Sequence, residues 1–258
     1  KKGRGLVLVP TRELALQVHQ HLFKMEPKIR LAVLIGGASM DKQIQELARH
    51  PRILIATPGR LIDHMNQRRV VLHDVEILVL DEADRMLDMG FAPQIQTILR
   101  TLPRDRQTLL FSATMPEEIM ALASSHMKLP VHVEIAKSGT VAEKITQELF
   151  VVKKEAKRDL LAKLLAQYHG TVLLFARTKI GARKITRFIR DARHNVAEIH
   201  SDRSLAQRRE ALEGFRSGKY RVLVATDIAS RGIDVRGIEL VINYDLPDEA
   251  ENYVHRIG

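Results

Sequence analysis

A chain of 258 residues is long enough for two hydrophobic cores, and its 45% apolar and 28% charged side chains are typical of a globular protein. No apolar run approaches the roughly 18 residues of a membrane helix, and the lack of cysteine excludes disulfides, thiolate metal sites and a cysteine nucleophile. We expect a cytoplasmic protein by default. The net charge of +10 favours a polyanionic partner, although solubility alone would also explain it.

The first half of the chain alternates short apolar runs with segments of helical spacing. Leu14, Val18 and Leu22 recur at helical spacing after Thr11, whose hydroxyl is a plausible helix cap. Continuous apolar runs predict strands that are buried on both faces of a parallel sheet covered by helices. The predicted strands are Leu6–Val9, Leu31–Ile35, Ile53–Ala56, Ile77–Leu80, Leu109–Phe111 and Val131–Ile135.

A small and polar stretch, residues 136–143, predicts a linker, and the same pattern then starts again. The second set of predicted strands is Leu149–Val152, Val172–Phe175, Val196–Ile199, Val222–Ala225 and Leu240–Ile242, with helices at Asp159–Gln167 and Lys179–Arg193. We therefore expect two α/β domains, residues 1–135 and 144–258, with net charges of +3 and +7. Aromatic side chains make up only 4% of the chain, which favours contact with a sugar-phosphate backbone over base stacking.

An acidic motif, Asp81-Glu82-Ala83-Asp84, directly follows the predicted strand Ile77–Leu80. Ligands of open parallel sheets bind beyond the carboxyl ends of the strands, so these carboxylates would point into a crevice. Asp81 could hold Mg²⁺ through its water shell, and Glu82 could orient or deprotonate an attacking water. An acidic turn that begins a helix is an equally good explanation of the motif taken alone.

Further short motifs follow the other predicted strands. Thr11 and Gly59 would begin helices whose free N–H groups, beside Arg12 and Arg60, suit phosphates, and Gly36-Gly37 would let a backbone approach a ligand closely. Each motif alone is more simply a turn, a loop or a solvated arginine. The remaining motifs are Ser112-Ala113-Thr114, Phe175–Lys179, His200-Ser201-Asp202, Ala225-Thr226-Asp227, Arg231–Asp234 and His255–Gly258.

In order and spacing, and over nearly the whole chain, this series resembles the DEAD-box family of superfamily 2 helicases. The resemblance implies two tandem RecA-like domains, with ATP and Mg²⁺ as cofactors and RNA as partner. It implies catalytic or coupling roles for Asp81, Glu82, Asp84, Ser112, Thr114 and His255, and nucleotide contacts for Asp81, Glu82, Gly232 and Asp234. It implies RNA contacts for Pro10, Thr11, Arg12, Gly36, Gly37, Thr57, Pro58, Gly59, Arg60, Arg177, Asp202, Arg208, Thr226 and Arg231.

Three departures from the family pattern qualify these expectations. The chain contains no G-x-x-x-x-G-K-[ST] phosphate loop, which the family has upstream of Pro10, and it stops at Gly258, before the two arginines that follow in the family. We therefore expect both domains to be incomplete. Ser201 and Leu205 stand where the family usually has Gly and Gln, and Leu205 cannot form the hydrogen bond of that Gln.

The sequence thus predicts an ATP-dependent RNA helicase core. The alternative is that the chain as it stands is an RNA-binding fragment without turnover. A DNA-translocating motor of the same superfamily fits the motifs less well, because these versions of them belong to the RNA branch.

Overall fold

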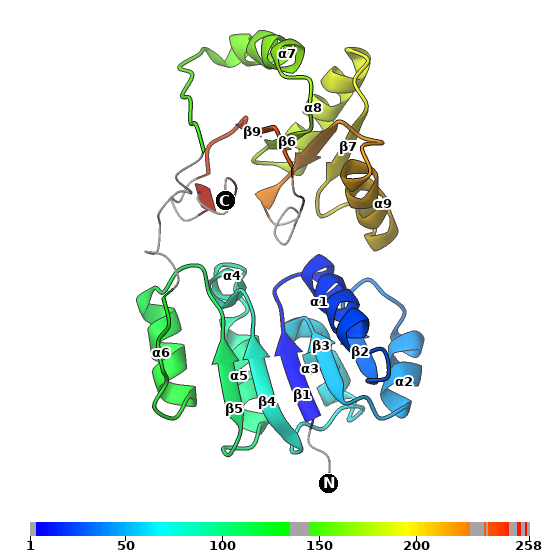
Figure 1. The fold of residues 1–258 in the computed structure, drawn as a ribbon, viewed down its shortest axis with the longest axis vertical. Helices are drawn as coiled ribbons and strands as arrows, with labels where there is room; N and C mark the ends of the chain where they lie inside the picture. The colour runs from blue at the N-terminus through cyan, green and yellow to red at the C-terminus, as the bar shows by residue number, and fades with distance from the viewer. Residues whose placement is uncertain are drawn as a thin grey trace. The chain divides into compact units, whose positions relative to one another are not determined.

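The computed structural model describes residues 4–134, 145–227, 235, 237–247, 252–253 and 256. The chain divides into two compact units, Lys1–Ser138 and Gly139–Gly258 (Figure 1). The predicted linker at 136–143 lies outside the described residues. Within them, every helix is too short or too polar to cross a lipid bilayer.

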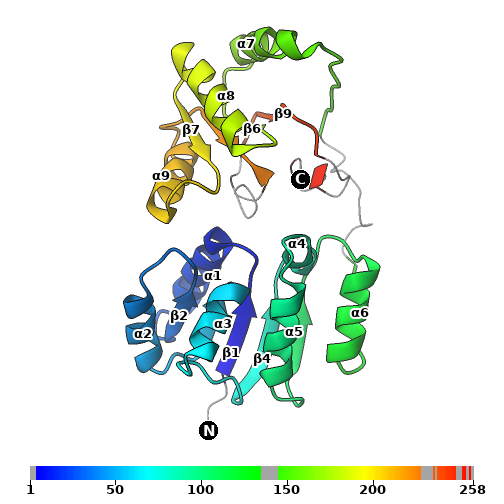
Figure 2. The same cartoon turned by 180° about the vertical axis from the view of Figure 1, so that it is seen from behind.

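The first unit is built on a sheet of parallel strands in the order β2-β3-β1-β4-β5. The strands are β1 Arg4–Leu8, β2 Leu31–Leu34, β3 Ile53–Ala56, β4 Val75–Leu80 and β5 Gln107–Leu110. The helices are α1 Arg12–Met25, α2 Met40–Ala48, α3 Pro58–Asn66, α4 Ala83–Asp88, α5 Ala92–Thr101 and α6 Glu117–His126. Helix α1 covers one face of the sheet, and α3 and α5 cover the other (Figures 1 and 2).

The burial of the central strands explains their continuous apolar sequence. Leu6 and Leu8 of β1 and Leu78 of β4 are fully buried, because helices cover both faces of the sheet. The Thr11 hydroxyl accepts a hydrogen bond from the Leu14 amide at 3.2 Å and so caps α1 immediately after β1. Strand, cap and helix thus follow one another directly, which places the polar residues of each motif at the edge of the sheet.

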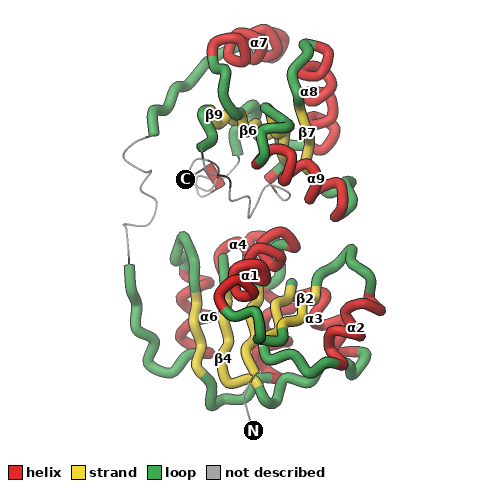
Figure 3. The backbone as a smooth tube through the Cα atoms, turned by 45° about the vertical axis from the view of Figure 1, so that its right-hand side comes forward, coloured by secondary structure: helices red, strands yellow, loops and turns green. Residues whose placement is uncertain are grey.

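The second unit repeats this layout with parallel strands in the order β7-β8-β6-β9. Figure 3 shows its strands in yellow and its helices in red. Its elements are the 3-10 turn η1 Lys154–Ala156, α7 Lys157–Gln167, β6 Val172–Phe175, α8 Lys179–Asp191, β7 Val196–Ile199, α9 Leu205–Arg216, β8 Val222–Ala225 and β9 Leu240–Asn243. Leu161 of α7 and Ile185 of α8 pack on one face of the sheet, and Phe215 of α9 packs on the other. The predicted fold class, two α/β domains with parallel sheets covered by helices, is confirmed.

Two predicted strands are wrong. The described part of Val131–Ile135 has no regular structure, and Val131 is 85% exposed. Leu149–Val152 is also irregular, and a cavity of about 1460 Å³ lies between this segment and β9. Neither segment pairs with a strand within the described residues. An apolar run becomes a strand only where a free sheet edge lies within hydrogen-bonding distance, and neither segment reaches one.

Candidate functional site

The sheet order of the first unit collects its motifs at one edge. All its strands are parallel, so their carboxyl ends meet at that edge, where ligands of such sheets bind. The adjacent strands β2, β3 and β1 lead into Gly36-Gly37, Thr57–Arg60 and Pro10-Thr11-Arg12. The adjacent strands β4 and β5 lead into the acidic motif and into Ser112–Thr114. The edge therefore has a basic half and an acidic half.

In the basic half, two arginines flank the loop after β2. The Arg12 guanidinium lies against the glycine pair, because a Cβ added at Gly36 would be 3.2 Å from its Nη2 and one at Gly37 would overlap its Nη1. Gly37 also has φ +75°, which other residues rarely adopt. Arg60 donates from Nη1 to the Ala38 carbonyl at 3.5 Å and pairs with Asp63 at the same distance. We call Arg12, Gly36, Gly37 and Arg60 the arginine–glycine cluster.

The start of α3 completes the basic half. Pro58 occupies the first turn, where its missing N–H leaves no donor unpaired, and the Thr57 side chain makes no capping hydrogen bond. A Cβ added at Gly59 would meet no atom within 4 Å, so a ligand can approach the backbone there. The first turn of α3 can thus offer N–H groups to an anion beside Arg60.

In the acidic half, Asp84 connects the loops that follow β4 and β5. Its Oδ2 accepts hydrogen bonds from the amide of Thr114 at 2.8 Å and from the Thr114 hydroxyl at 2.9 Å. Its Oδ1 accepts from the Arg85 amide at 2.9 Å, and its own amide donates to the Ser112 hydroxyl at 3.1 Å. Asp84 is only 4% exposed, so these bonds take the place of water.

Asp81 and Glu82 lie on the more open side of the same loop. Burial, and next the neighbouring charge of Glu82, raise the pKa of Asp81. Glu82 has φ +51°, a strained conformation for a side chain of this size, and its carboxylate accepts from Arg85 Nη1 at 2.5 Å. Arg85 is 7% exposed. Sequence reasoning missed Arg85, although its place three residues after Glu82 in a helical start was the available signal.

The acidic pair fits a magnesium ion that takes most of its ligands from elsewhere. Asp81 is a carboxylate with a raised pKa and adjacent negative charge, so a nearby cation would relieve its repulsion. No cluster of three side chains able to bind a metal occurs in the described part of the chain. Magnesium commonly keeps several waters and uses one or two carboxylates together with substrate phosphates, which agrees with such a donor set.

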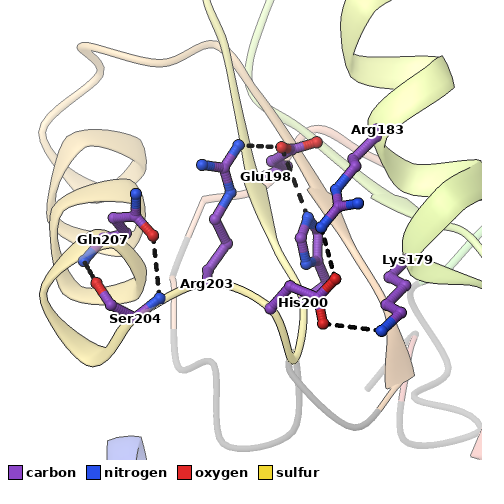
Figure 4. Close-up of polar contacts among 8 residues, drawn as sticks. Lys179, Arg183, Glu198, His200, Arg203, Ser204 and Gln207 are labelled. Carbon is purple, nitrogen blue, oxygen red and sulfur yellow. Dashed lines mark hydrogen bonds and ion pairs between the residues drawn. The ribbon is translucent and has the colours of Figure 1, made fainter.

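The second unit also gathers its described motifs at the strand ends. The Arg177 amide donates to Asp245 Oδ2 at 3.1 Å, which joins the loops after β6 and β9. Asp202, in the loop after β7, accepts from Lys179 at 2.8 Å and from Arg183 at 2.6 Å, both from α8 (Figure 4). These bonds, that of Lys179 first, lower the pKa of Asp202. Asp202 is therefore a paired carboxylate at neutral pH.

Glu198 and His200 form a buried polar group behind that loop (Figure 4). His200 is fully buried, and burial lowers its pKa; its Nε2 lies 3.5 Å from Glu198 Oε1. Burial alone would raise the pKa of Glu198, but the hydrogen bond and charge of Arg203 outweigh it and lower the pKa. The ion pair between Glu198 and Arg203 thus joins β7 to the loop between β7 and α9.

The departures Ser201 and Leu205 fall in this region. Ser201 is exposed in the loop after β7. Leu205 is the first residue of α9 and lies within a capping box. The Ser204 hydroxyl accepts from the Gln207 amide at 3.3 Å, and the Gln207 side chain accepts from the Ser204 amide at 3.0 Å. The helix start is thus secured without a polar side chain at position 205.

Arg208 on α9 is 9% exposed, and Thr226, directly after β8, is 8% exposed. The predicted site residues Arg231, Gly232, Asp234 and His255 lie outside the described residues. Arg256, which was part of a quoted motif but had no predicted role, donates to both Asp227 oxygens, at 2.6 and 2.7 Å. It is 6% exposed and lies over the Phe175 ring at 4.9 Å, so it links the end of β6 with the loop after β8.

Comparisons with known proteins agree with this geometry. The DEAD/DEAH box helicase model matches residues 1–122, and the helicase conserved C-terminal domain model matches residues 156–258. The chain is 44% identical over 259 aligned positions to the ATP-dependent RNA helicase CshA of Listeria monocytogenes, covering 99% of this chain and 50% of that protein. It therefore spans about half the length of the curated relatives it matches.

Solved structures are similar as well. Dbp5 of S. cerevisiae bound to RNA and ADP BeF3 matches with a TM-score of 0.87 and 31% identity, over 99% of this chain and 67% of that one. A DEAD box protein from the hyperthermophile Methanococcus jannaschii matches with a TM-score of 0.50 and 35% identity, over 100% of this chain and 70% of that one.

The chain belongs to the DEAD-box family of superfamily 2 helicases. Its two units are the RecA-like α/β domains of that family.

Proposed function

We propose that the protein to which this chain belongs is an ATP-dependent RNA helicase, which couples ATP binding and hydrolysis to RNA binding and local duplex unwinding. The observation that carries the proposal is the division of one sheet edge into the arginine–glycine cluster and the acidic half joined by Asp84. The Listeria relative is called an ATP-dependent RNA helicase, and the Dbp5 structure is bound to RNA and ADP BeF3, which supports the same activity. We also propose a cytoplasmic location, on the absence of cysteine.

In this proposal the basic half of the first domain holds RNA by its backbone. Helix N-termini and arginines are suited to phosphates and carry no information about base sequence. We assign RNA contacts in the first domain to Pro10, Thr11, Arg12, Gly36, Gly37, Thr57, Pro58, Gly59 and Arg60, and in the second to Arg177, Asp202, Arg208, Thr226 and Arg231. The binding should therefore be indifferent to sequence and sensitive to the sugar.

The acidic half would serve the nucleotide. We assign Glu82 to orienting or deprotonating the attacking water and Asp81 to holding Mg²⁺ through water, with Gly232 and Asp234 as further nucleotide contacts. Mg²⁺, when bound, supplies positive charge beside the nucleotide phosphates. Asp84, Ser112, Thr114 and His255 would couple the nucleotide state to the RNA-binding parts. The domain bounds, 1–135 and 144–258 with a linker at 136–143, are part of the proposal.

The test is Glu82→Gln in a longer version of the protein that includes a phosphate loop. RNA-stimulated ATP hydrolysis should fall by about 10² to 10⁴, since that is the usual effect of losing a positioned base, while ATP and RNA binding persist. An unchanged rate would remove Glu82 from the reaction. The 258-residue chain assayed beside it distinguishes the alternative, because an RNA-binding fragment without turnover would bind RNA and hydrolyse no ATP.

A further inference from the structure

Helix α8 has an outer surface that the motifs of the proposed function do not include. Its inner face, Ala182, Ile185, Thr186 and Ile189, is buried against the sheet. Its outer face is exposed and carries five basic side chains over thirteen residues, Lys179, Arg183, Lys184, Arg187 and Arg190, with Asp191 as the single acid.

Three of these cations have no acidic partner within the described residues. Lys179 and Arg183 pair with Asp202, but Lys184, Arg187 and Arg190 form no ion pair there. On the opposite face of the same sheet, α9 behaves differently: Arg209 lies 3.5 Å from Glu213, and nearby Lys219 lies 2.5 Å from Glu210. A need for surface charge alone does not explain why one face is neutralised and the other is not.

The unpaired cations continue a surface that begins at the strand ends. Lys179 and Arg183 lie at the start of α8 and contact the loop after β7, and Arg187 and Arg190 follow Arg183 at the spacing that keeps them on one side of a helix. Arg190 lies eleven positions after Lys179, so at 1.5 Å per residue the basic surface extends by about 16 Å. Arg158 of α7, which lies over the Phe188 ring at 5.9 Å, adds a further cation beside it.

The chemistry of this surface fits a phosphate backbone better than a protein partner. Ile180 is the single large apolar side chain exposed on α8, whereas the centre of a protein interface is usually apolar and poor in charge. Phe188 is partly buried, so the surface offers no aromatic ring for base stacking. Arginine guanidinium groups match phosphates in geometry, and each contact releases counterions.

We propose that the outer face of α8, through Lys184, Arg187 and Arg190, is an additional binding surface for the sugar-phosphate backbone of RNA that extends beyond the strand-end motifs. It rests on the proposed function, because it engages the same strand of RNA after that strand leaves the edge of the sheet. The surface contributes affinity and no sequence preference.

The test uses the 258-residue chain and fluorescence anisotropy with two labelled single-stranded RNAs, a short one and one about ten nucleotides longer. About 16 Å of backbone corresponds to roughly five nucleotides at helical spacing, so the longer RNA extends past the whole α8 surface. The variant is Lys184→Gln/Arg187→Gln/Arg190→Gln, and glutamine keeps the helix propensity. The matched control, Arg209→Gln/Arg216→Gln/Lys219→Gln, removes the same charge from the α9 side of the domain. Thermal unfolding by circular dichroism checks that both remain folded.

The α8 variant should bind the long RNA about tenfold or more weakly, with the slope of log affinity against log salt reduced by about 2, while the short RNA is little affected. The control should change both affinities much less. Equal losses in the two triple variants, or equal losses for the two RNAs, would overturn the proposal. Binding of poly-glutamate that depends on the same three residues as strongly as RNA does would instead indicate an acidic protein partner and would also overturn it.

A separate variant, Arg12→Ala/Arg60→Ala, distinguishes this proposal from the proposed function. If that change leaves short-RNA binding intact, the strand-end assignment fails. The α8 surface is then judged on the length dependence alone.

Discussion

Replacement of Asp84 should weaken the first domain by more than any single hydrogen bond would suggest. Asp84→Ala leaves three donors without their acceptor: the amide and hydroxyl of Thr114 and the amide of Arg85. A hydrogen bond to a charged acceptor contributes about 1.5 to 3 kcal/mol, and a site 4% exposed gives water little access to replace it. Because the Thr114 hydroxyl can rotate to another partner, we expect a loss of about 4 kcal/mol rather than the full sum.

Thr114→Val isolates the contribution of the Thr114 hydroxyl from that of the two backbone amides that donate to Asp84. It keeps the backbone amide and removes one bond to the Asp84 carboxylate, of 2.9 Å, so it should lower the free energy of unfolding by about 1.5 kcal/mol. In the double variant with Asp84→Ala the two losses of stability should sum to about 1.5 kcal/mol less than additivity predicts, since the hydroxyl bond can be lost only once. Thr108→Val on β5 is the control, because Thr108 lies on the strand that leads into Thr114 and makes none of these bonds.

Urea unfolding of the 258-residue chain, followed by circular dichroism, measures these costs. Amide hydrogen exchange at Thr114 assigns them to the first domain rather than the second. Additive losses, or an Asp84→Ala variant within about 1 kcal/mol of the parent, would refute the reasoning, because the buried acceptor would then not be holding the two loops together.

Other predictions follow from the charged residues. Burial raises the pKa of Asp81, so its charge opposes folding at neutral pH. Asp81→Asn should therefore raise the unfolding midpoint at pH 7 without Mg²⁺. This gain in stability should vanish as the pH falls to 3.8, the pKa of the aspartate in the unfolded chain. Burial lowers the pKa of His200, so the protein should lose stability as the pH falls below 6.5, the pKa of the histidine in the unfolded chain. A His200→Gln variant whose stability falls with pH in parallel with that of the parent would contradict this. Arg12→Ala and Arg60→Ala should each weaken binding to all RNA sequences alike and reduce the salt slope by about 0.7, as read from salt titrations; a sequence-dependent loss would exclude backbone contact.

Most of the fold was predictable because buried strands and capped helices leave strong local signals. Thr11 predicted the start of α1, and the runs that became β3, β6, β7 and β8 were predicted with their bounds unchanged. The failures at Val131 and Leu149 have a common cause. An apolar run shows that a segment avoids water, but strand pairing depends on which edge is free in three dimensions.

The sequence predicted which motifs gather at the site, but it did not predict which side chains contact one another there. The resemblance implied catalytic or coupling roles for both Asp84 and Thr114, and the structure places the Asp84 Oδ2 atom 2.8 Å from the Thr114 amide. Arg85 and Arg256 escaped notice because a buried arginine is recognised by the carboxylate it meets, and the sequence does not show that Arg256 reaches Asp227. The roles of the site residues stay predictions.

The place of β1 at the centre of its sheet has a consequence for synthesis of the chain. β1 pairs with β3 and β4, whose residues are made some 50 to 70 positions later. Leu6 and Leu8, fully buried in the finished domain, therefore stay uncovered while the residues up to β3 and β4 are translated. β1 can pair with β3 once that strand has left the ribosome, but its other edge stays open until β4 follows, so the centre of the sheet closes only then.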